Sequence, residues 1–393
     1  MTNCFQFMNL ESYFYQISLV EAVLLVIFFS ALAVQVYMYI YYYTGIIRHK
    51  KRVDKQTMQT NVDQLPVSVI ICAKNESENL AAFLPLILEQ NYPNYEVIVV
   101  NDGSTDETEL LLNEFQTRYP QLYYTFMPEG TKIISRKKLA LSLGIKAAKH
   151  ELLLFTDADC RPLTSGWITE IVRQFTPTTE FVLGYGAYLP AKSLLSRMIS
   201  YDTLFIAMQY MGFAFRGKPY MGIGRNLAYR KETFFRSKGF AGTLHIASGD
   251  DDLLVNRVAT STNTNIASVA ASVTQSVPKT TFSEWYHQKE RHLTTAPMYH
   301  ARSKWMVAIE PISRGLFYAS FLGLIPFLNP LVWIVIGSLF LARYILQLVV
   351  VNKTASQLRE RSFYATILLF DVILPVVTLF LMIFGRKKSF SWK

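Results

Sequence analysis

Cysteine is scarce in this chain of 393 residues, and its polar middle contains no glycine-rich phosphate loop. The three cysteines, Cys4, Cys72 and Cys160, lack the paired spacing of zinc sites and disulfide scaffolds, which indicates a reducing compartment. Because no loop of the Rossmann or Walker type is present in that region, a dinucleotide cofactor and an ATPase activity are both disfavoured.

Charged residues are also few, at 17% of the chain, and three long blocks contain almost none: 17–47, 316–351 and 362–384. Blocks of this length and composition predict membrane segments. A cleaved signal peptide is the alternative for the first block, but no Lys or Arg precedes it. We therefore expect an integral protein of the cell (inner) membrane.

Basic residues follow the first block, which predicts that the next segment lies in the cytoplasm. They are Arg48, Lys50, Lys51, Arg52 and Lys55. Anionic lipid head groups and a phosphate-bearing substrate explain the net charge of +10 more simply than nucleic acid, which is not an expected partner. The predicted parts are an N-terminal membrane segment (1–47), a basic linker (48–65), a cytosolic α/β domain with an interfacial helix near its end (66–303), and a C-terminal membrane region of two or three segments with a short basic tail (304–393).

The topology of the C-terminal region is less regular. Residues 315–351 number 37, slightly short of two crossings of roughly 20 residues each, and Asn329-Pro330 suggests a turn between them. A further crossing at 362–384 would place the basic residues 386–388 outside, against the positive-inside tendency, so one segment is expected to be re-entrant or interfacial. Asp371 is either a buried hydrogen-bonding group of the bundle or part of a substrate path.

Strand and helix patterns alternate in the polar middle. The apolar run 66–73 ends in a polar loop with Glu76 and a helical pattern, and a second run, 95–100, ends in the loop Asn101-Asp-Gly-Ser-Thr-Asp106. This alternation predicts a parallel, doubly wound sheet, whose ligands bind at the carboxyl ends of the strands. Glu76 and Asp102 fall at those ends, where an acidic side chain can accept hydrogen bonds from a base or ribose. Turn chemistry and helix capping are the alternative for the second loop.

A third apolar run, beginning at Glu151, delivers Asp157 and Asp159 at its end. Residues two apart in a strand point the same way, so both carboxylates can face one hard cation, Mg²⁺ or Mn²⁺. A turn or a helix cap is the alternative for an isolated Asp-x-Asp. The basic helical segment 137–149 comes just before, and although most of its cations are expected to be solvated, Lys137 is expected to receive phosphates.

The order of these features resembles the family-2 glycosyltransferases with the GT-A fold, in particular membrane-bound bacterial-type members. The four motifs that carry the resemblance are Ala73-Lys-Asn75-Glu76, Asn101-Asp-Gly-Ser-Thr-Asp106, Lys137-Lys-Leu-Ala-Leu141 and Asp157-Ala-Asp159. The resemblance implies a GT-A (Rossmann-like) α/β domain with a mainly parallel sheet, flanked by transmembrane helices, and a nucleotide-sugar donor. It places Ala73, Asn75, Glu76, Asp102, Lys137 and Asp157 on the donor and Asp159 on the metal.

The second half of the domain is similar to the acceptor side of the same family. The stretch from Gly222 to Arg230 implies acceptor-side roles for Gly224 and Asn226, although its glycines can equally be loop punctuation. The run Ser248-Gly-Asp250-Asp251-Asp252 implies Asp251 as general base with Asp250 beside it. A helix N-terminal cluster favoured by the dipole is the alternative.

Residues 285–292 resemble the Gln-x-x-Arg-Trp motif of membrane-bound members, with His292 in place of the tryptophan. Gln288 and Arg291 are then expected on the donor diphosphate, and the missing tryptophan argues against a processive synthase. The alternative is an amphipathic helix on the membrane with Trp285 and Tyr286 at the interface.

The resulting interpretation is a metal-dependent, inverting, hexosyltransferase-like enzyme (EC 2.4). It moves a sugar from a nucleotide-sugar donor to a lipid, lipid-linked or glycan acceptor at the cytoplasmic membrane face. The alternative is a catalytically inactive, membrane-anchored protein that binds nucleotide-sugars or acts as a scaffold. A transporter is disfavoured, because the membrane segments are few and the soluble domain is large.

Overall fold

A seven-stranded sheet lies at the centre of the α/β domain. The computed structural model describes residues 17–56, 65–128, 135–327 and 330–384. In spatial order the strands of the sheet are β3 (Leu122–Phe126), β2 (Tyr95–Asn101), β1 (Val67–Ala73), β4 (Leu152–Asp157), β8 (Leu227–Arg230), β6 (Phe181–Gly184) and β9 (Thr264–Ala267). A smaller sheet has the order β5 (Cys160–Pro162), β10 (Thr274–Ser276) and β7 (Gly186–Tyr188).

The first four strands of the large sheet are parallel, as the alternating pattern predicts. β8 enters antiparallel between β4 and β6, so the sheet is mixed beyond β4. A mainly parallel GT-A-like sheet is confirmed, but the doubly wound parallel order holds only for the first half of the domain.

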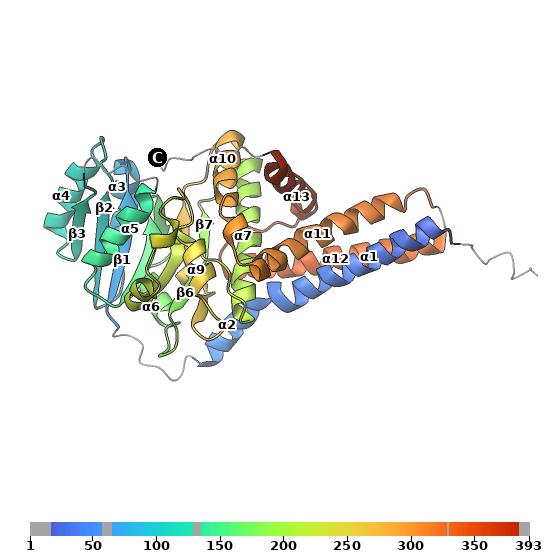
Figure 1. Ribbon diagram of the computed structural model, residues 1–393, viewed down its shortest axis with the longest axis horizontal. Helices are drawn as coiled ribbons and strands as arrows, with labels where there is room; N and C mark the ends of the chain where they lie inside the picture. The colour runs from blue at the N-terminus through green and yellow to red at the C-terminus, as the bar shows by residue number, and fades with distance from the viewer. Residues whose placement is uncertain (1–16, 57–64, 129–134, 328–329, 385–393) are drawn as a thin grey trace, which may run out of the picture.

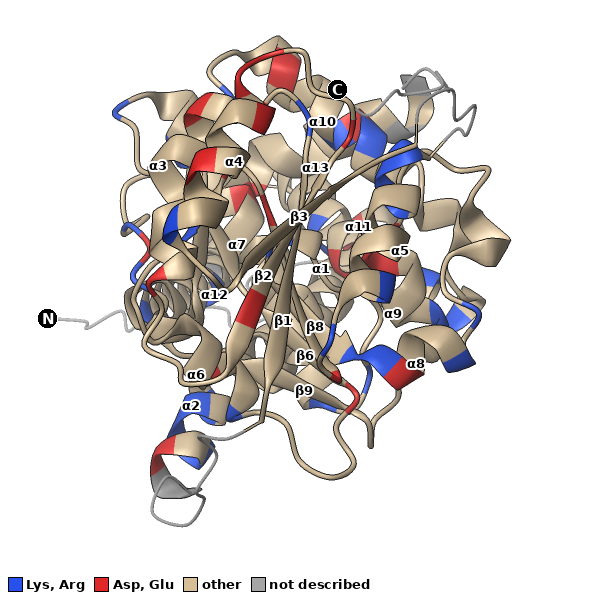
Figure 2. Cartoon of the chain, turned by 90° about the vertical axis from the view of Figure 1, so that its left-hand side faces the viewer, with Lys and Arg blue, Asp and Glu red and all other residues tan. Residues whose placement is uncertain are grey.

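Helices cover both faces of the sheet. Figure 2 views the domain from the β3 edge, with α3 (Ser77–Leu88), α4 (Thr108–Arg118) and α6 (Trp167–Val172) on one side of the strands and α5 (Arg136–Ala147) and α9 (Asp252–Val258) on the other. Successive residues of β1 alternate between these layers, since Ile70 packs in the core beneath α5 and Ile71 in the core beneath α3. Gly144 permits this packing, because a Cβ there would lie 2.7 Å from Ile70 Cγ2.

Long helices extend from the domain (Figure 1). α1 (Leu19–Tyr37), α11 (Ala301–Gly323) and α12 (Pro330–Gln357) run side by side, whereas α13 (Ile367–Phe384) packs on α7 (Leu194–Phe215). By length and composition, two helices among the described residues are candidate membrane spans, Leu19–Asp54 and Val332–Gln357. The expected turn residue Asn329 and the basic tail lie outside the described residues.

The first apolar block continues as one helical rod beyond residue 47. A π-helical turn, η2 (Met38–Tyr43), joins α1 to α2 (Gly45–Gln56), so residues 48–56 are helix where a linker was expected. The π turn lies against α7 at Gly212, where a Cβ would be 2.4 Å from the Tyr42 carbonyl oxygen. Arg48 and Arg216 donate hydrogen bonds to the Ile40 and Tyr41 carbonyls, at 3.1 and 3.0 Å, which satisfies backbone groups at this irregular turn.

Asp371 is a buried hydrogen-bonding group of the helical bundle, the first of the two interpretations given above. Its carboxylate accepts hydrogen bonds from Arg314 at 3.0 Å, Arg343 at 2.9 Å, Gln347 at 2.8 Å and Tyr318 at 2.6 Å. Glu310 pairs with the same Arg314, at 2.8 Å, so two anions balance two cations. Such compensation is what allows ionised groups to be buried.

Candidate active site

The carboxyl ends of β1, β2 and β4 meet at one edge of the sheet. Ala73 pairs in register with Asn101, and Cys72 pairs with Asp157, so the polar residues that follow each strand share one region. The backbone ties the loops together, since Asp102 N–H donates to the Ala73 carbonyl at 2.8 Å. Ala73 itself is fully buried and its carbonyl takes part in this bond, so its contact with the donor stays a prediction.

Asn75 holds the first of these loops against the second. Its φ of +54° places it in the left-handed region, where asparagine is tolerated. Its N–H donates to Ser104 Oγ at 2.9 Å, and its Oδ1 accepts from Thr105 N–H at 2.8 Å. The neighbouring Glu76 is buried and accepts a hydrogen bond from Asn79 Nδ2 at 2.6 Å. The structure therefore brings both residues to the predicted edge.

Asp102 is fully buried and forms a salt bridge with Arg136. The Arg136 Nε–H donates to its Oδ1 at 2.8 Å, and this hydrogen bond raises the pKa of Arg136. Asp102 Oδ2 is buried without a hydrogen-bond partner among the described residues. Arg136 was not singled out in the sequence, and only its position directly before the basic helical segment 137–149 could have distinguished it.

Asp157 ends β4, Cys160 begins β5, and Asp159 lies on the turn between them. One ligand atom from each of these three residues lies within 4.8 Å of the others. Burial and the charge of Asp157 raise the pKa of Asp159, and burial raises the pKa of the Cys160 thiol, which favours its neutral form. The atoms available as metal ligands are therefore carboxylate oxygens, which fit Mg²⁺ or Mn²⁺ better than a soft metal.

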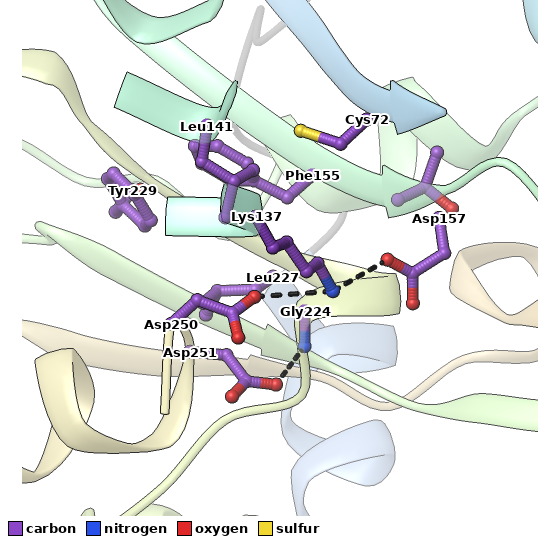
Figure 3. A pocket seen from close by; sticks show the side chains of 11 residues that line it. Cys72, Lys137, Leu141, Phe155, Asp157, Gly224, Leu227, Tyr229, Asp250 and Asp251 are labelled. Atoms are coloured by element: carbon purple, nitrogen blue, oxygen red, sulfur yellow. Dashed lines mark hydrogen bonds and ion pairs between the residues drawn. The ribbon is translucent and has the colours of Figure 1, made fainter. Parts of the chain in front are cut away.

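Lys137 lies between the two halves of the site. Its Nζ is 3.1 Å from Asp157 Oδ1 and 3.3 Å from Asp250 Oδ2 (Figure 3). Burial alone would lower the pKa of Lys137, but the surrounding carboxylates, Asp157 foremost, raise it well above its usual value. The side chain is therefore a fixed positive charge that joins the carboxyl end of β4 to the Asp250–Asp251 loop.

Asp251 both caps α9 and faces the cavity that contains Lys137. Its Oδ1 accepts from Asp252 N–H at 2.8 Å, and its Oδ2 accepts from Gly224 N–H (Figure 3). Burial, Asp250 and Asp252 raise the pKa of Asp251 to about 7. Burial alone would raise the pKa of Asp250 too, but the Lys137 ammonium lowers it. The capping interpretation is confirmed for Asp251, and the raised pKa also suits a proton acceptor near neutral pH.

Gly224 and Asn226 have different surroundings, although they are only two residues apart. Gly224 lines the cavity, and a Cβ there would lie 3.3 Å from Asp251 Oδ2. Asn226 is fully buried beneath it, donating to the Tyr185 and Ser272 carbonyls at 2.8 and 2.7 Å and accepting from Trp167 Nε1 at 3.1 Å. The Asn226 side chain therefore bonds to the framework, and these contacts give no support to the acceptor-side role predicted for it.

The helix α10 (Phe282–Leu293) packs on the domain. Trp285 is buried at 2% exposure, and Lys289 forms a salt bridge with Asp202 of α7 at 2.7 Å, so the interpretation of Trp285 as a membrane-interface residue is wrong. Gln288 donates to the Tyr188 hydroxyl at 3.2 Å. The position of Arg291 on the donor diphosphate stays a prediction.

One cationic residue, Arg225, and one aromatic residue, Tyr188, were not singled out in the sequence. The Arg225 guanidinium lies over the Tyr188 ring, 4.3 Å from its centroid, and Gly186 leaves the space that this arginine occupies. Tyr188 also contacts Gln288, so these side chains connect the small sheet to α10. Tyr188 lies in a stretch without any motif, whereas Arg225 lies between Gly224 and Asn226 in the stretch 222–230, where no pattern distinguished it from its neighbours.

The mixed sheet, with acidic residues gathered at the carboxyl ends of its parallel strands, is a GT-A-like fold. Residues 68–238 of the chain match the family model described as glycosyl transferase family 2. The matched segment includes Asp157 and Asp159, whereas Asp250, Asp251 and α10 lie beyond it.

Relatives agree with this assignment. The chain is 37% identical over 98 residues to glycosyltransferase AglE of Haloferax volcanii, covering 24% of this chain and 31% of that protein. It is 28% identical over 241 residues to the probable glycosyltransferase YdaM of Bacillus subtilis, covering 59% and 55%. The chain thus spans about a third and about half of these two relatives. A mannosyltransferase of Pyrobaculum calidifontis, solved with GDP-Man and Mn²⁺, has the same fold, with a TM-score of 0.58, 17% identity and coverage of 94% and 100%.

Proposed function

We propose that the protein is a metal-dependent, inverting glycosyltransferase that moves a sugar from a nucleotide-sugar donor to a lipid, lipid-linked or glycan acceptor. One observation carries this proposal: the donor-edge carboxylate Asp157 and the acceptor-side carboxylate Asp251 line one cavity, with Lys137 between them. A donor and an acceptor hydroxyl can meet only where both kinds of group face the same space.

The donor side supplies binding and charge. Asp159 and Asp157 would hold Mg²⁺ or Mn²⁺, which neutralises the departing nucleotide diphosphate when bound. Asp102, oriented by Arg136, and Glu76 would bind the base and ribose at the strand ends. Lys137, Gln288 and Arg291 place positive or donor groups around the expected position of the diphosphate.

The acceptor side supplies the base. Asp251 accepts the proton of the acceptor hydroxyl while that hydroxyl attacks the anomeric carbon from the face opposite the nucleotide. The Gly224 N–H and the Asp252 N–H hold the carboxylate in place. One carboxylate suffices for this inversion, because the leaving group is stabilised by a cation and needs no acid.

The apolar helices support a position of this chemistry beside a membrane. The two candidate spans, Leu19–Asp54 and Val332–Gln357, support an integral membrane protein, and the exposed basic residues of α2 support a cytoplasmic domain at the inner membrane. A hydrophobic or lipid-linked acceptor is the acceptor class that benefits from such an arrangement.

The test is nucleotide release by the purified protein in detergent, with UDP-, GDP-, dTDP- and CMP-sugars, Mg²⁺ or Mn²⁺, and added membrane lipid extract. We expect release from one donor class, only with metal. Donor binding without release under every condition would favour the inactive binding or scaffold protein. Absence of binding to all donors would overturn both.

A further inference from the structure

Three basic residues begin α5, and Lys138 is the one that is fully buried. The side chains of Arg136 and Lys137 are 31% and 19% exposed. The Lys138 ammonium donates three hydrogen bonds to backbone carbonyls, those of Thr243 at 2.8 Å, Ile246 at 3.1 Å and Ser248 at 2.7 Å. A lysine has three donors, so all are used. Burying an ammonium is unfavourable unless it is hydrogen-bonded in this way.

The three carbonyls belong to the loop that leads into the Asp250–Asp251 pair. Residues 244–251 form no helix or strand in the described structure, and Ala241, Gly242 and His245 nearby are exposed. Ser135, just before α5, adds a contact of 3.5 Å from its Oγ to the Ala247 carbonyl. The start of α5 therefore provides the buried anchor of an otherwise solvent-facing loop.

Consecutive residues of α5 reach three different parts of the site. Arg136 pairs with Asp102 of the β2 loop, Lys137 bridges Asp157 and Asp250, and Lys138 holds the loop before Asp250. Neighbouring side chains on a helix point about 100° apart, so one turn can serve all three. The donor edge and the base thereby share one rigid element.

We propose that Lys138 is a positioning residue for sugar transfer: by holding the carbonyls of Thr243, Ile246 and Ser248, it sets the loop so that Asp251 faces the donor edge. Lys138 touches neither donor nor acceptor in this account. The proposal rests on the proposed function for its effect on transfer, but the anchoring of the loop can be measured without turnover.

The experiment compares wild type with Lys138→Met, which keeps the length of the side chain and removes its three donors. Lys146→Met, an exposed lysine on the same helix, is the control. We measure donor affinity by calorimetry, transfer rate, and hydrogen exchange of backbone amides. Lys138→Met should bind donor within about twofold of wild type but transfer at least about tenfold more slowly, as expected when a reacting group is misplaced. Exchange should quicken in residues 243–251 and stay unchanged in the sheet.

Other outcomes overturn the proposal. Unchanged exchange in the loop would show that Lys138 does not anchor it, whether or not the wild type transfers sugar. A parallel loss of donor affinity and transfer, with faster exchange throughout, would indicate a general folding role. Absence of transfer in wild type would count against the proposed function alone, because loop exchange still tests the anchor. If Lys138→Met does not fold, Lys138→Gln, which keeps two donor hydrogens, is measured with the same expectations at smaller size.

Discussion

Replacing Asp251 by asparagine should remove most of the transfer activity and stabilise the fold at alkaline pH. Burial and the neighbouring Asp250 and Asp252 raise the pKa of Asp251 from 3.8 to about 7. Since one pKa unit corresponds to about 1.4 kcal/mol, ionising this group in the fold opposes folding by up to about 4 kcal/mol above pH 7. Asparagine avoids that cost but gives up one of two hydrogen bonds, worth about 1 kcal/mol.

The sign follows from the direction of the shift. A carboxyl whose pKa is raised in the folded state contributes stability that is fully present below its unfolded pKa of 3.8 and is lost as pH rises through about 7. The difference in stability between Asp251→Asn and wild type should therefore grow in favour of the variant between pH 5 and pH 8, by roughly 2–3 kcal/mol. Thermal unfolding in detergent at both pH values measures it.

Asp106→Asn is the matched control. Burial alone would raise the pKa of Asp106, but hydrogen bonds from Thr108 and Ser77 lower it to about 2. Its contribution is present above the unfolded pKa and is lost only as pH falls through about 2, so this variant should be destabilised equally at pH 5 and pH 8.

Activity tests the same carboxylate independently. A base with a pKa of about 7 is roughly 10% ionised at pH 6 and 90% at pH 8, so wild-type transfer should rise about tenfold over that range. Asp251→Asn should be slower by about 10²–10⁴-fold at pH 8. A flat pH profile, together with an asparagine variant that is active and no more stable at pH 8 than at pH 5, would refute the reasoning.

Four further substitutions, one of them a control, test the framework by thermal unfolding in detergent. Gly212→Ala should destabilise the fold strongly, because the new Cβ would lie 2.4 Å from the Tyr42 carbonyl oxygen. Gly315→Ala is the control and should have little effect, because no atom lies within 4 Å of its Cβ position. Equal effects of the two substitutions would contradict the close approach of α7 to the π-helical turn. Asp371→Ala should destabilise by about 3–5 kcal/mol by leaving two buried arginines short of an anion, and a neutral result would show that the ion pairs are dispensable. Asn226→Ala should lower the unfolding temperature and leave the acceptor KM of the remaining folded enzyme unchanged; a selective rise in KM would support its acceptor-side role.

The donor half of the site could be predicted from the sequence because period-two strands and their polar ends are local signals. β1 lies between β2 and β4 in the sheet and is parallel to both, so the carboxyl ends of all three strands meet at one edge. Asp102 and Asp157 therefore lie where the alternation of strand and helix predicted, without knowledge of any tertiary contact.

The acceptor half of the site depends on which of several adjacent side chains points into the cavity. The hydrophobic periodicity of the sequence does not predict this. Gly224 and Asn226 share a short 3-10 turn, yet one lines the cavity and the other is buried in the framework. Lys137 and Lys138 look alike in sequence, but the helix aims one at carboxylates and the other at carbonyls. Trp285 is an aromatic residue in a stretch with the pattern of an amphipathic helix, which suggested a membrane-interface position. It is instead buried against the domain.

The antiparallel strand β8 shows a similar limit. Its four residues, Leu227–Arg230, follow a turn and carry no long alternating pattern, so the sequence did not indicate where they enter the sheet. Their position between β4 and β6 is set by long-range pairing.

The most direct test of the account measures binding and turnover of one donor side by side in three proteins. Wild type, Asp159→Ala and Asp251→Asn are titrated with the donor found in the panel, with and without Mn²⁺, and nucleotide release is followed in the same samples. We predict that Asp159→Ala loses metal-dependent binding and release together, whereas Asp251→Asn binds like wild type and releases almost no nucleotide. Release by Asp251→Asn at the wild-type rate, or metal-dependent binding that survives in Asp159→Ala, would contradict the account.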